Sequence, residues 1–273
     1  MTAIAIADAS GAAVPSVAGR FLGLRPLLRK DRTEWMRGRR AWIVAGLTTT
    51  FMVLTAANGA INNYVRTNFP EPELAGTPLP SLDPATNLLA ALSSQIFVVA
   101  AVFAVASLIV HERDTGTLAW MASKPVSRGS IWLSKWISST AILAVAAGLV
   151  PLAITTGVVV ALYGTVSLSV LALILVGMIA AIAFFAAVGL AAGTVVPGQP
   201  AIVAVGLGIL FLVPVLTGLL PVDVTPYLPT SILDWTIGLA AGQDVGWATP
   251  IAWAIGTTVI VALAIRRMDS IEL

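Results

Sequence analysis

The chain has 273 residues, of which 58% are hydrophobic and only 10% are charged, and its formal net charge is +2. Roughly a quarter of the residues in a soluble domain are charged, so this composition excludes a water-soluble fold and indicates that lipid surrounds most of the chain. The absence of cysteine excludes disulfides and thiolate metal sites. Such a small net charge gives no reason to expect a nucleic-acid partner.

The first forty residues contain a tail and an amphipathic segment. Residues 1–20 are rich in Ala and Ser and lack the basic start and apolar core of a signal peptide, so we expect a flexible cytoplasmic tail. In the segment 21–40, apolar residues recur at helical spacing, namely Phe21, Leu24, Leu27, Leu28 and Trp35. The charged residues expected to turn away from them are Arg29, Lys30, Asp31 and Arg32. This pattern predicts a helix at the membrane interface with its basic face toward lipid headgroups; the alternative is a basic linker.

Six stretches contain no Asp, Glu, Lys, Arg or His and are long enough to cross a bilayer, which takes about 20 residues. They cover residues 41–61, 88–110, 136–162, 169–190, 201–220 and 247–265. Because lipid offers no partner for unpaired backbone groups, each stretch is predicted to form a continuous helix. The predicted fold is an all-α integral membrane protein, in which residues 21–273 form one transmembrane domain with six spans.

The basic residues predict the orientation of these spans. Eight lie between Arg20 and Arg40, four lie in the polar segment 111–135 between the second and third spans, and two follow the sixth span. Only Arg66 falls in a segment assigned to the outside. By the positive-inside rule, both termini and the polar segment are predicted to be cytoplasmic. We therefore expect a multi-pass protein of the cell membrane, either an inner or a plasma membrane, in contact with its lipids.

Three features of the spans and loops carry further expectations. Pro151 lies inside the third span and is expected to bend it, because proline lacks the amide that continues a helix. Gly189 and Gly193 form a small-residue pair of the kind that lets two helices pack closely. The long, half-apolar segment 222–246 is either a set of short helices at the membrane edge or a surface loop.

The polar segment 111–135 reads HERDTGTLAWMASKPVSRGSIWLSK. Its first four residues are ionisable, and the Gly116 region is expected to end the second helix. An apolar stretch follows, which is suited to a short helix that ends before Pro125. Ser127 or Ser130 is placed to cap the next helix. The prediction is a short helix across the base of the bundle, joined to two spans that tilt when it is pushed.

Several kinds of chemistry have no motif in this sequence. No G-x-x-x-x-G-K-[ST] loop is present to cradle nucleotide phosphates. His111 is the single histidine, and the chain has no cysteine to complete a zinc site. We therefore expect a protein that is not an enzyme and carries no cofactor or metal of its own. A function driven by ATP would require a partner chain that binds ATP and Mg²⁺.

The polar segment resembles the signature of permease subunits of the type-2 ATP-binding-cassette exporter family. The residues that carry the resemblance are Glu112, Gly116-Thr117-Leu118, Ser123, Pro125-Val126-Ser127-Arg128 and Lys135. The chain departs from the family pattern after Leu118. It reads Ala119-Trp120-Met121-Ala122, where the family tends to Leu-rich sequence with an acidic residue.

The resemblance implies that this segment contains a coupling helix that docks on an ATPase subunit. The residues it assigns to coupling are Glu112, Gly116, Thr117, Leu118, Trp120, Met121, Ser123, Pro125 and Arg128. It also implies two copies of the ATPase and a second permease subunit, either an identical copy or a close relative. The alternative is that these charges are ordinary residues at the ends of spans, which only set the topology.

The function implied by the resemblance is export of an amphipathic or apolar substrate: a drug-like compound, a lipid or a lipid-linked glycan. Candidate residues of the substrate path are Thr55, Asn58, Ser94 and Gln95, although hydrogen bonds between helices explain these polar residues equally well. Two other functions stay open. One is a permease coupled to an ATPase that serves maturation of an extracytoplasmic enzyme or mechanical signalling. The other is an ion-coupled carrier, which the uncharged spans disfavour.

Overall fold

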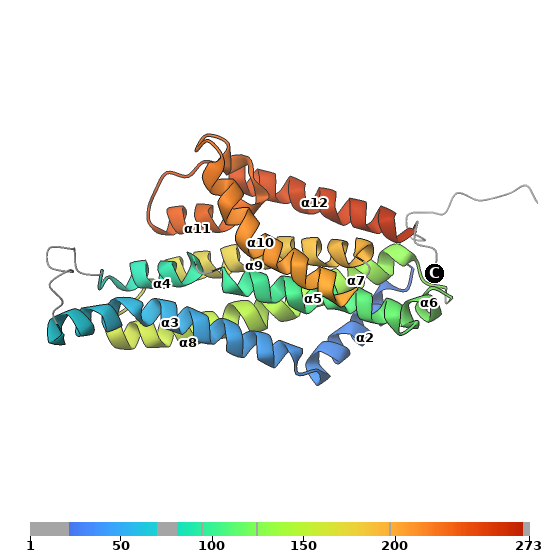
Figure 1. The fold of residues 1–273 in the computed structure, drawn as a ribbon, viewed down its shortest axis with the longest axis horizontal. Helices are drawn as coiled ribbons and strands as arrows, with labels where there is room; N and C mark the ends of the chain where they lie inside the picture. Colours follow the sequence, from blue (N-terminus) through green and yellow to red (C-terminus); the bar gives the residue numbers. More distant parts are fainter. Residues whose placement is uncertain (1–21, 70–80, 94, 124, 197, 270–273) are drawn as a thin grey trace, which may run out of the picture.

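A computed structural model describes residues 22–69, 81–93, 95–123, 125–196 and 198–269 (Figure 1). The tail expected at residues 1–20 lies outside this part of the chain. All regular structure in the described residues is helical. The α-helices are α2 (Leu24–Arg37), α3 (Arg40–Asn68), α4 (Pro84–Ser93), α5 (Ile96–Asp114), α6 (Thr117–Ala122), α7 (Arg128–Leu143), α8 (Val150–Tyr163), α9 (Leu168–Val195), α10 (Gln199–Leu219), α11 (Ile232–Ala240) and α12 (Ala248–Asp269).

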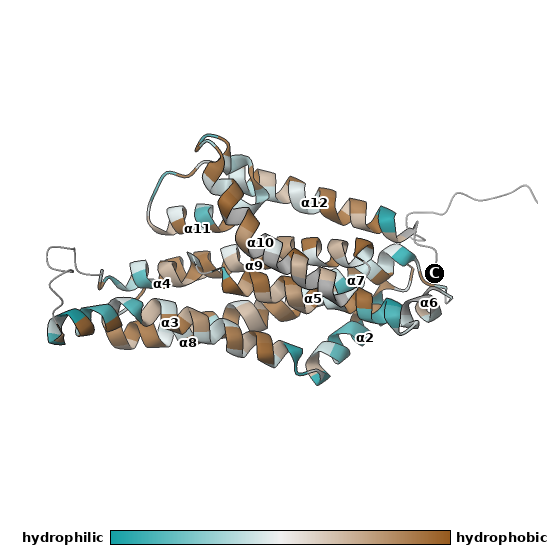
Figure 2. Cartoon of the chain, viewed as in Figure 1, coloured by the Kyte–Doolittle hydropathy of each residue, from teal (hydrophilic) through white to brown (hydrophobic). Residues whose placement is uncertain are grey.

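Five helical segments are long and apolar enough to cross a membrane: Arg40–Asn68, Pro84–Asp114, Arg128–Tyr163, Leu168–Val195 and Ala248–Met268. They coincide with five of the six predicted spans. The remaining one, 201–220, corresponds to α10, a helix of 21 residues. Several side chains of α10 lie outside the described part, and the count of six spans stays a prediction. Apolar residues fill the middle of the long helices, and hydrophilic residues gather toward their ends and on α2 (Figure 2).

The bundle is built around α5, which packs against α3, α9 and α10. The closest approach is to α9 and depends on Gly189 and Gly193. A Cβ atom at Gly189 would lie 2.8 Å from Val105 Cγ2, and one at Gly193 would lie 2.9 Å from the Ala106 carbonyl oxygen. The predicted close packing at this glycine pair is therefore confirmed. It makes the α5–α9 pair the rigid centre to which the polar segment is attached.

The second predicted span is interrupted, which contradicts the expectation of one continuous helix. α4 ends at Ser93 and α5 begins at Ile96, and Gln95 between them adopts a left-handed backbone conformation with φ 48°. The backbone groups of Gln95 stay paired at this break. The Gln95 amide donates to the Leu92 carbonyl, and the Gln95 carbonyl accepts from Val98. Gln95 therefore leaves no bare polar backbone group of its own, as a lipid environment requires.

The third predicted span runs from α7 to α8 through a π-helical turn at Ala144–Leu149. Here the Val150 amide donates to the Val145 carbonyl, five residues earlier. Pro151 follows at once and has no amide to donate. The wider turn accommodates the hydrogen bond that Pro151 cannot make. The irregularity expected at Pro151 is therefore one extra residue in the helical turn before it.

The amphipathic helix predicted at 21–40 forms as α2, but a different face is buried. α2 packs on α7 through Leu27, Asp31 and Trp35, which are spaced four residues apart. Asp31 was expected to turn away with the basic residues, and this expectation is wrong. The residue lies on the same stripe as Leu27 and Trp35, so the geometry of the helix buries its carboxylate along with them.

The segment 222–246 forms short helices rather than an open loop. Two 3₁₀ turns, Thr225–Tyr227 and Pro229–Ser231, lead into α11, which packs against α9. Ile232, Leu233 and Thr236 are its buried residues on this side. Of the two alternatives left open by the sequence, the structure therefore supports helices attached to the bundle. α11 lies at the end of the molecule opposite to α6 (Figure 1).

Candidate functional site: the base of the bundle at α2, α5, α6 and α7

The polar segment folds as the sequence predicts, into a helix end, a short helix, a turn and a new helix. α5 ends at Asp114, and the Thr115 hydroxyl donates to the His111 carbonyl. Gly116 has φ +69°, a conformation that side chains disfavour, and its position leaves open space for a Cβ atom. The glycine is therefore needed for its backbone shape. Ser127 caps α7 by accepting a hydrogen bond of 3.1 Å from the Ser130 amide.

Four charged residues from three helices meet behind α6, and we call them the basal charge cluster: Lys30 and Asp31 of α2, Glu112 of α5 and Lys135 of α7. Lys135 Nζ lies 2.7 Å from Glu112 Oε1 and 3.6 Å from Asp31 Oδ1. Lys30 Nζ lies 3.2 Å from the same Glu112 oxygen. The side chain of Lys135 is only 4% exposed. Charges buried this deeply are stable only when paired, so the three helices depend on one another here.

Hydrogen bonds extend the cluster along α2 and α7. The Ser134 hydroxyl donates to Asp31 Oδ2 over 2.7 Å, and Trp35 Nε1 donates to the Ser139 hydroxyl over 3.2 Å. At the other end of α2, the Ser127 amide donates to the Leu22 carbonyl. α2 is thus fastened along its length to the turn before α7 and to α7 itself. The interfacial helix is part of the site rather than a separate anchor.

The pKa values of Asp31 and Lys30, both on α2, are shifted by two opposing effects, burial and pairing with opposite charges. Burial raises the pKa of the Asp31 carboxyl, and the opposing effects of Lys135 and Ser134 do not fully offset it. Burial by itself would lower the pKa of Lys30, but the charge and hydrogen bond of Glu112, together with the charges of Glu34 and Asp31, raise it. Lys30 is therefore held as a cation in contact with Glu112.

The short helix α6 is connected to the cluster through Met121. Met121 is buried, and its sulfur accepts a hydrogen bond of 3.4 Å from Lys30 Nζ. Trp120, the next residue on α6, is 59% exposed. A displacement of α6 would therefore act on Lys30 through the side chain of Met121, and on Glu112 through Lys30.

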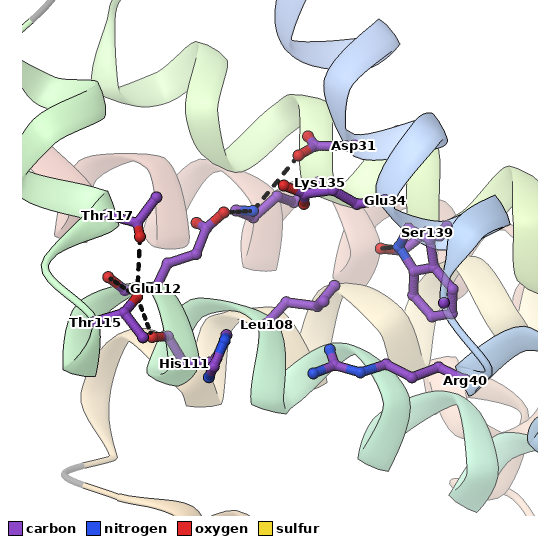
Figure 3. Close-up of a pocket in the computed structure, with 12 residues that line it drawn as sticks. Asp31, Glu34, Arg40, Leu108, His111, Glu112, Thr115, Thr117, Lys135 and Ser139 are labelled. Atoms are coloured by element: carbon purple, nitrogen blue, oxygen red, sulfur yellow. Dashed lines mark hydrogen bonds and ion pairs between the residues drawn. The ribbon is translucent and has the colours of Figure 1, made fainter.

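A cavity of about 400 Å³ lies between α2, α5 and α7 beside the cluster. Figure 3 shows Glu112 and Lys135 pointing toward each other and in contact at its wall, and His111 and Arg40 also line it. One oxygen of Glu112, Oε2, is buried without a hydrogen-bond partner among the described residues. The cluster therefore keeps one unused acceptor next to an open space.

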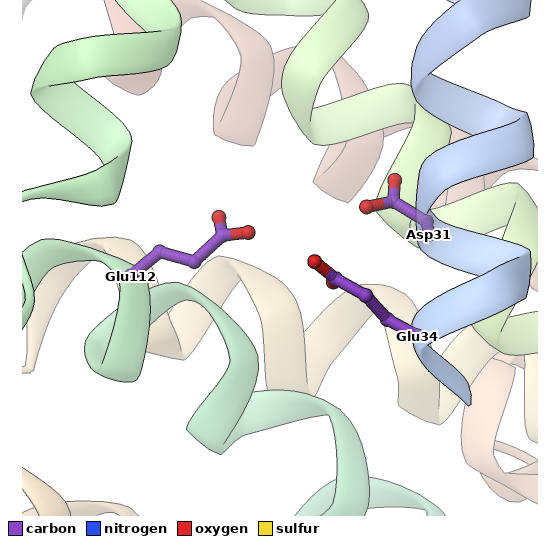
Figure 4. A group of neighbouring side chains, drawn as sticks. All are labelled: Asp31, Glu34 and Glu112. Atoms are coloured by element: carbon purple, nitrogen blue, oxygen red, sulfur yellow. The ribbon is translucent and has the colours of Figure 1, made fainter. Parts of the chain in front are cut away.

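Three carboxylates of this region come close enough to bind a metal ion. Oxygen atoms of Asp31, Glu34 and Glu112 lie within 4.8 Å of one another (Figure 4). Lys30 and Lys135 already place ammonium groups against these carboxylates. Cations that belong to the chain neutralise the carboxylates, so we assign the group to an ion-pair cluster rather than to a metal site.

The coupling residues proposed from the sequence occupy several kinds of position. Glu112 and Met121 are buried, and Trp120, Ser123 and Pro125 are exposed. The Thr117 hydroxyl pairs with that of Thr115, and the Ser123 hydroxyl donates to the Trp120 carbonyl. Arg128 reaches the Met268 carbonyl of α12 at 3.5 Å. The side chain of Leu118 lies outside the description.

The structure describes three of the four residues proposed for a substrate path. Thr55 and Asn58 lie on α3, where Thr55 bonds to its own helix and Asn58 to Asn62. Ser94 lies outside the described residues. Gln95 lines a cavity near α10 and α11. A common path through these residues stays a prediction.

Sequence reasoning missed the two lysines and Asp31 as members of the site. Lys135 belonged to the motif but was not assigned a contact, and Lys30 and Asp31 were assigned to lipid headgroups. The signal for Asp31 was its spacing from Leu27 and Trp35, four residues on either side. For Lys30 the sequence offers no such signal, because its partner Glu112 lies 82 positions away.

An all-helical bundle with several helices long and apolar enough to cross a membrane is the architecture of a multi-pass membrane protein. The model of the ABC-2 transporter family matches residues 25–236, which include nearly all of α2, the basal charge cluster and the first half of α11. The chain therefore belongs to the ABC-2 transporter family and is a permease subunit of an ATP-binding-cassette transporter. Membership of this family implies a separate ATPase partner. A comparison with curated proteins finds no match.

Proposed function

We propose that this permease subunit exports an amphipathic or apolar substrate, and that two ATPase subunits drive it by docking on α6. One observation carries the proposal: α6 turns Trp120 outward at the end of the bundle and Met121 inward onto the basal charge cluster. An exposed aromatic side chain is a frequent anchor of protein interfaces. The same helix thus has a surface for a partner and a contact to the spans.

The cluster provides a route for force from α6 into the bundle. Lys30 contacts Met121 of α6 and Glu112 of α5, while Lys135 of α7 joins Glu112 to Asp31. Because buried ion pairs resist separation, α2, α5 and α7 are expected to move together when α6 is displaced. Two copies of the permease, or one with a close relative, would enclose the substrate path between them.

The character of the substrate follows from the spans. The segments predicted to cross the membrane carry no Asp, Glu, Lys, Arg or His, so a path along them offers no charged ligand to a free ion. An apolar or amphipathic compound, such as a drug-like molecule, a lipid or a lipid-linked glycan, matches these surfaces better. The lack of charge also disfavours an ion-coupled carrier.

The test is docking of the ATPase on a Trp120→Ala variant. The permease and the ATPase encoded with it would be co-expressed, purified together and reconstituted in lipid nanodiscs. Truncating an interface anchor typically costs more than 2 kcal/mol, or at least about thirtyfold in affinity. We expect that loss for Trp120→Ala, along with lost stimulation of ATP hydrolysis.

The matched control is Trp247→Ala. Trp247 is also strongly exposed, but it precedes α12 at the opposite end of the molecule. This variant should bind the ATPase as the unmodified chain does. If the Trp120→Ala variant docked normally, the assignment of α6 as the coupling helix would be wrong. Normal docking without transport of any compound in a panel would favour a role in enzyme maturation or signalling.

A further inference from the structure

A second cavity, which we call the outer pocket, lies where the second span breaks, toward the end of the molecule opposite to α6. Its volume is about 340 Å³, within the range of small-molecule sites. The polar side chains that line it are Gln95, Thr217, Thr225, Thr230, Ser231 and Asp234. They come from the start of α5, the end of α10, the two 3₁₀ turns and α11. Five separate segments therefore contribute polar groups to one space.

The break at Gln95 places a side-chain amide at this cavity. Gln95 adopts φ 48°, a left-handed conformation that residues other than glycine disfavour. Its backbone groups bond to Leu92, Val98 and Val99. Within the described part of the chain, the side-chain amide has no hydrogen-bond partner. The strained residue thus leaves its amide available at the pocket.

Asp234 gives the pocket its charge. Its carboxylate has no ion pair or hydrogen bond within the described residues, and no basic side chain lines the cavity. Burial alone raises the pKa of this carboxyl, with no charged group opposing the effect. Asp234 is an exposed residue, so a ligand in the pocket can reach its carboxylate. A bound cation would supply a counter-charge.

We propose that the outer pocket binds the protonated amine of an amphipathic ligand, with Asp234 as its counter-charge and the hydroxyl and amide oxygens as hydrogen-bond acceptors. An anion would be repelled by Asp234, and a neutral polyol would leave the carboxylate unpaired. A divalent metal ion prefers several carboxylates, and the pocket provides one. The inference rests on the proposed export function, for which it names the head group of the substrate.

The experiment measures binding to the permease alone, in nanodiscs without ATPase. The cationic probe is a dansyl-labelled primary alkylamine, which is protonated at neutral pH. Its neutral isostere carries a methyl group in place of the ammonium, and a third probe carries a glucoside. Empty nanodiscs correct for partition into lipid. The unmodified protein should bind the cationic probe about tenfold more tightly than the isostere, the effect of one partly desolvated charge pair.

Variants assign this preference to the pocket. Asp234→Asn keeps the shape and removes the charge, so the cationic probe should bind about tenfold less tightly while the neutral isostere is unaffected. Asp234→Glu should keep the preference. Asp244→Asn is the matched control, because Asp244 is an exposed acidic residue of the same outer segment that does not line the pocket.

Three results would overturn the proposal. The first is equal binding of the cationic probe and its isostere by the unmodified protein. The second is an unchanged cationic preference in Asp234→Asn. The third is tighter binding of the glucoside, which would make the pocket a polyol site. Because no ATPase takes part, failure here leaves the docking test on α6 unaffected, and failure of that test leaves the amine site standing.

Discussion

Lys135 is the residue on which the base of the bundle depends most, because its ammonium group faces carboxylates from two other helices. We expect Lys135→Met to lower the free energy of unfolding by roughly 3–5 kcal/mol, the usual cost of leaving buried charges without their partner. The measurement is denaturation of the purified protein in mixed detergent micelles. Methionine keeps the length of the side chain, so the loss would report charge rather than volume.

Two further variants make the Lys135 result specific. Arg32→Met removes a basic residue from the exposed side of α2 and should leave stability within about 0.5 kcal/mol of the original. Adding Asp31→Asn to Lys135→Met should recover part of the loss, since one buried carboxylate is then neutral. A Lys135→Met protein as stable as the unmodified one would mean that the cluster does not hold these helices together.

At the scale of elements, α4 depends on an aspartate at its start. The Asp83 carboxylate accepts hydrogen bonds from the amide and the hydroxyl of Thr86, and these bonds lower the pKa of Asp83 below its ordinary value of 3.8. We expect Asp83→Ala to speed hydrogen exchange in the first turn of α4 about fivefold, equivalent to about 1 kcal/mol of capping energy. The measurement is exchange resolved by mass spectrometry.

The same cap predicts a dependence on pH. A carboxyl whose pKa is lowered in the folded state stabilises the protein fully above its ordinary pKa, and this stabilisation is lost as the pH falls through the lowered value. The difference between Asp83→Ala and the unmodified protein should therefore begin to shrink as the pH falls below about 3.8 and should vanish below the lowered pKa. Asp83→Asn, which caps without titrating, should exchange slowly at every pH. A difference that persists in strong acid would contradict the capping role.

The elements also show what the sequence could and could not predict. The apolar runs place the helices, because lipid requires long uncharged segments, and Gly116, Pro125 and Ser127 place the turns of the polar segment. The break at Gln95 was not predictable, since a short polar run there is equally compatible with a continuous helix. Asp31 was assigned to the exposed face of its helix because it is charged, although its spacing from Leu27 and Trp35 places it on the buried face. The ion pairs of the basal charge cluster join residues far apart in the chain, and no local pattern reports them.

At the scale of the whole molecule, α2, α6 and the last turn of α12 lie at the same end (Figure 1). Because the chain has no cysteine, single cysteines test its orientation without background. We expect a membrane-impermeant maleimide to label Thr165→Cys on intact cells. Ser123→Cys and Arg266→Cys should be labelled only after permeabilisation, because both are predicted to face the cytoplasm.

The labelling pattern also counts the spans. If α10 crosses the membrane, the chain makes six crossings, and Ser123 and Arg266 lie on one side. Labelling of Arg266→Cys on intact cells, with Ser123→Cys protected, would mean an odd number of crossings and would refute the six-span arrangement. The unmodified chain should give no signal under either condition.

The π-helical turn before Pro151 has a consequence for how the third span evolves. One additional residue rotates the side chains that follow it by about 100° around the helix axis. The two halves of this span, α7 and α8, can therefore present different faces to the surrounding helices. α7 faces α2, α9 and α12, whereas α8 faces α3 and α4. The extra residue thus changes the face that the helix turns toward its neighbours between α7 and α8. Substitutions in α8 can adapt the outer half to new neighbours while the half that carries Lys135 keeps its register.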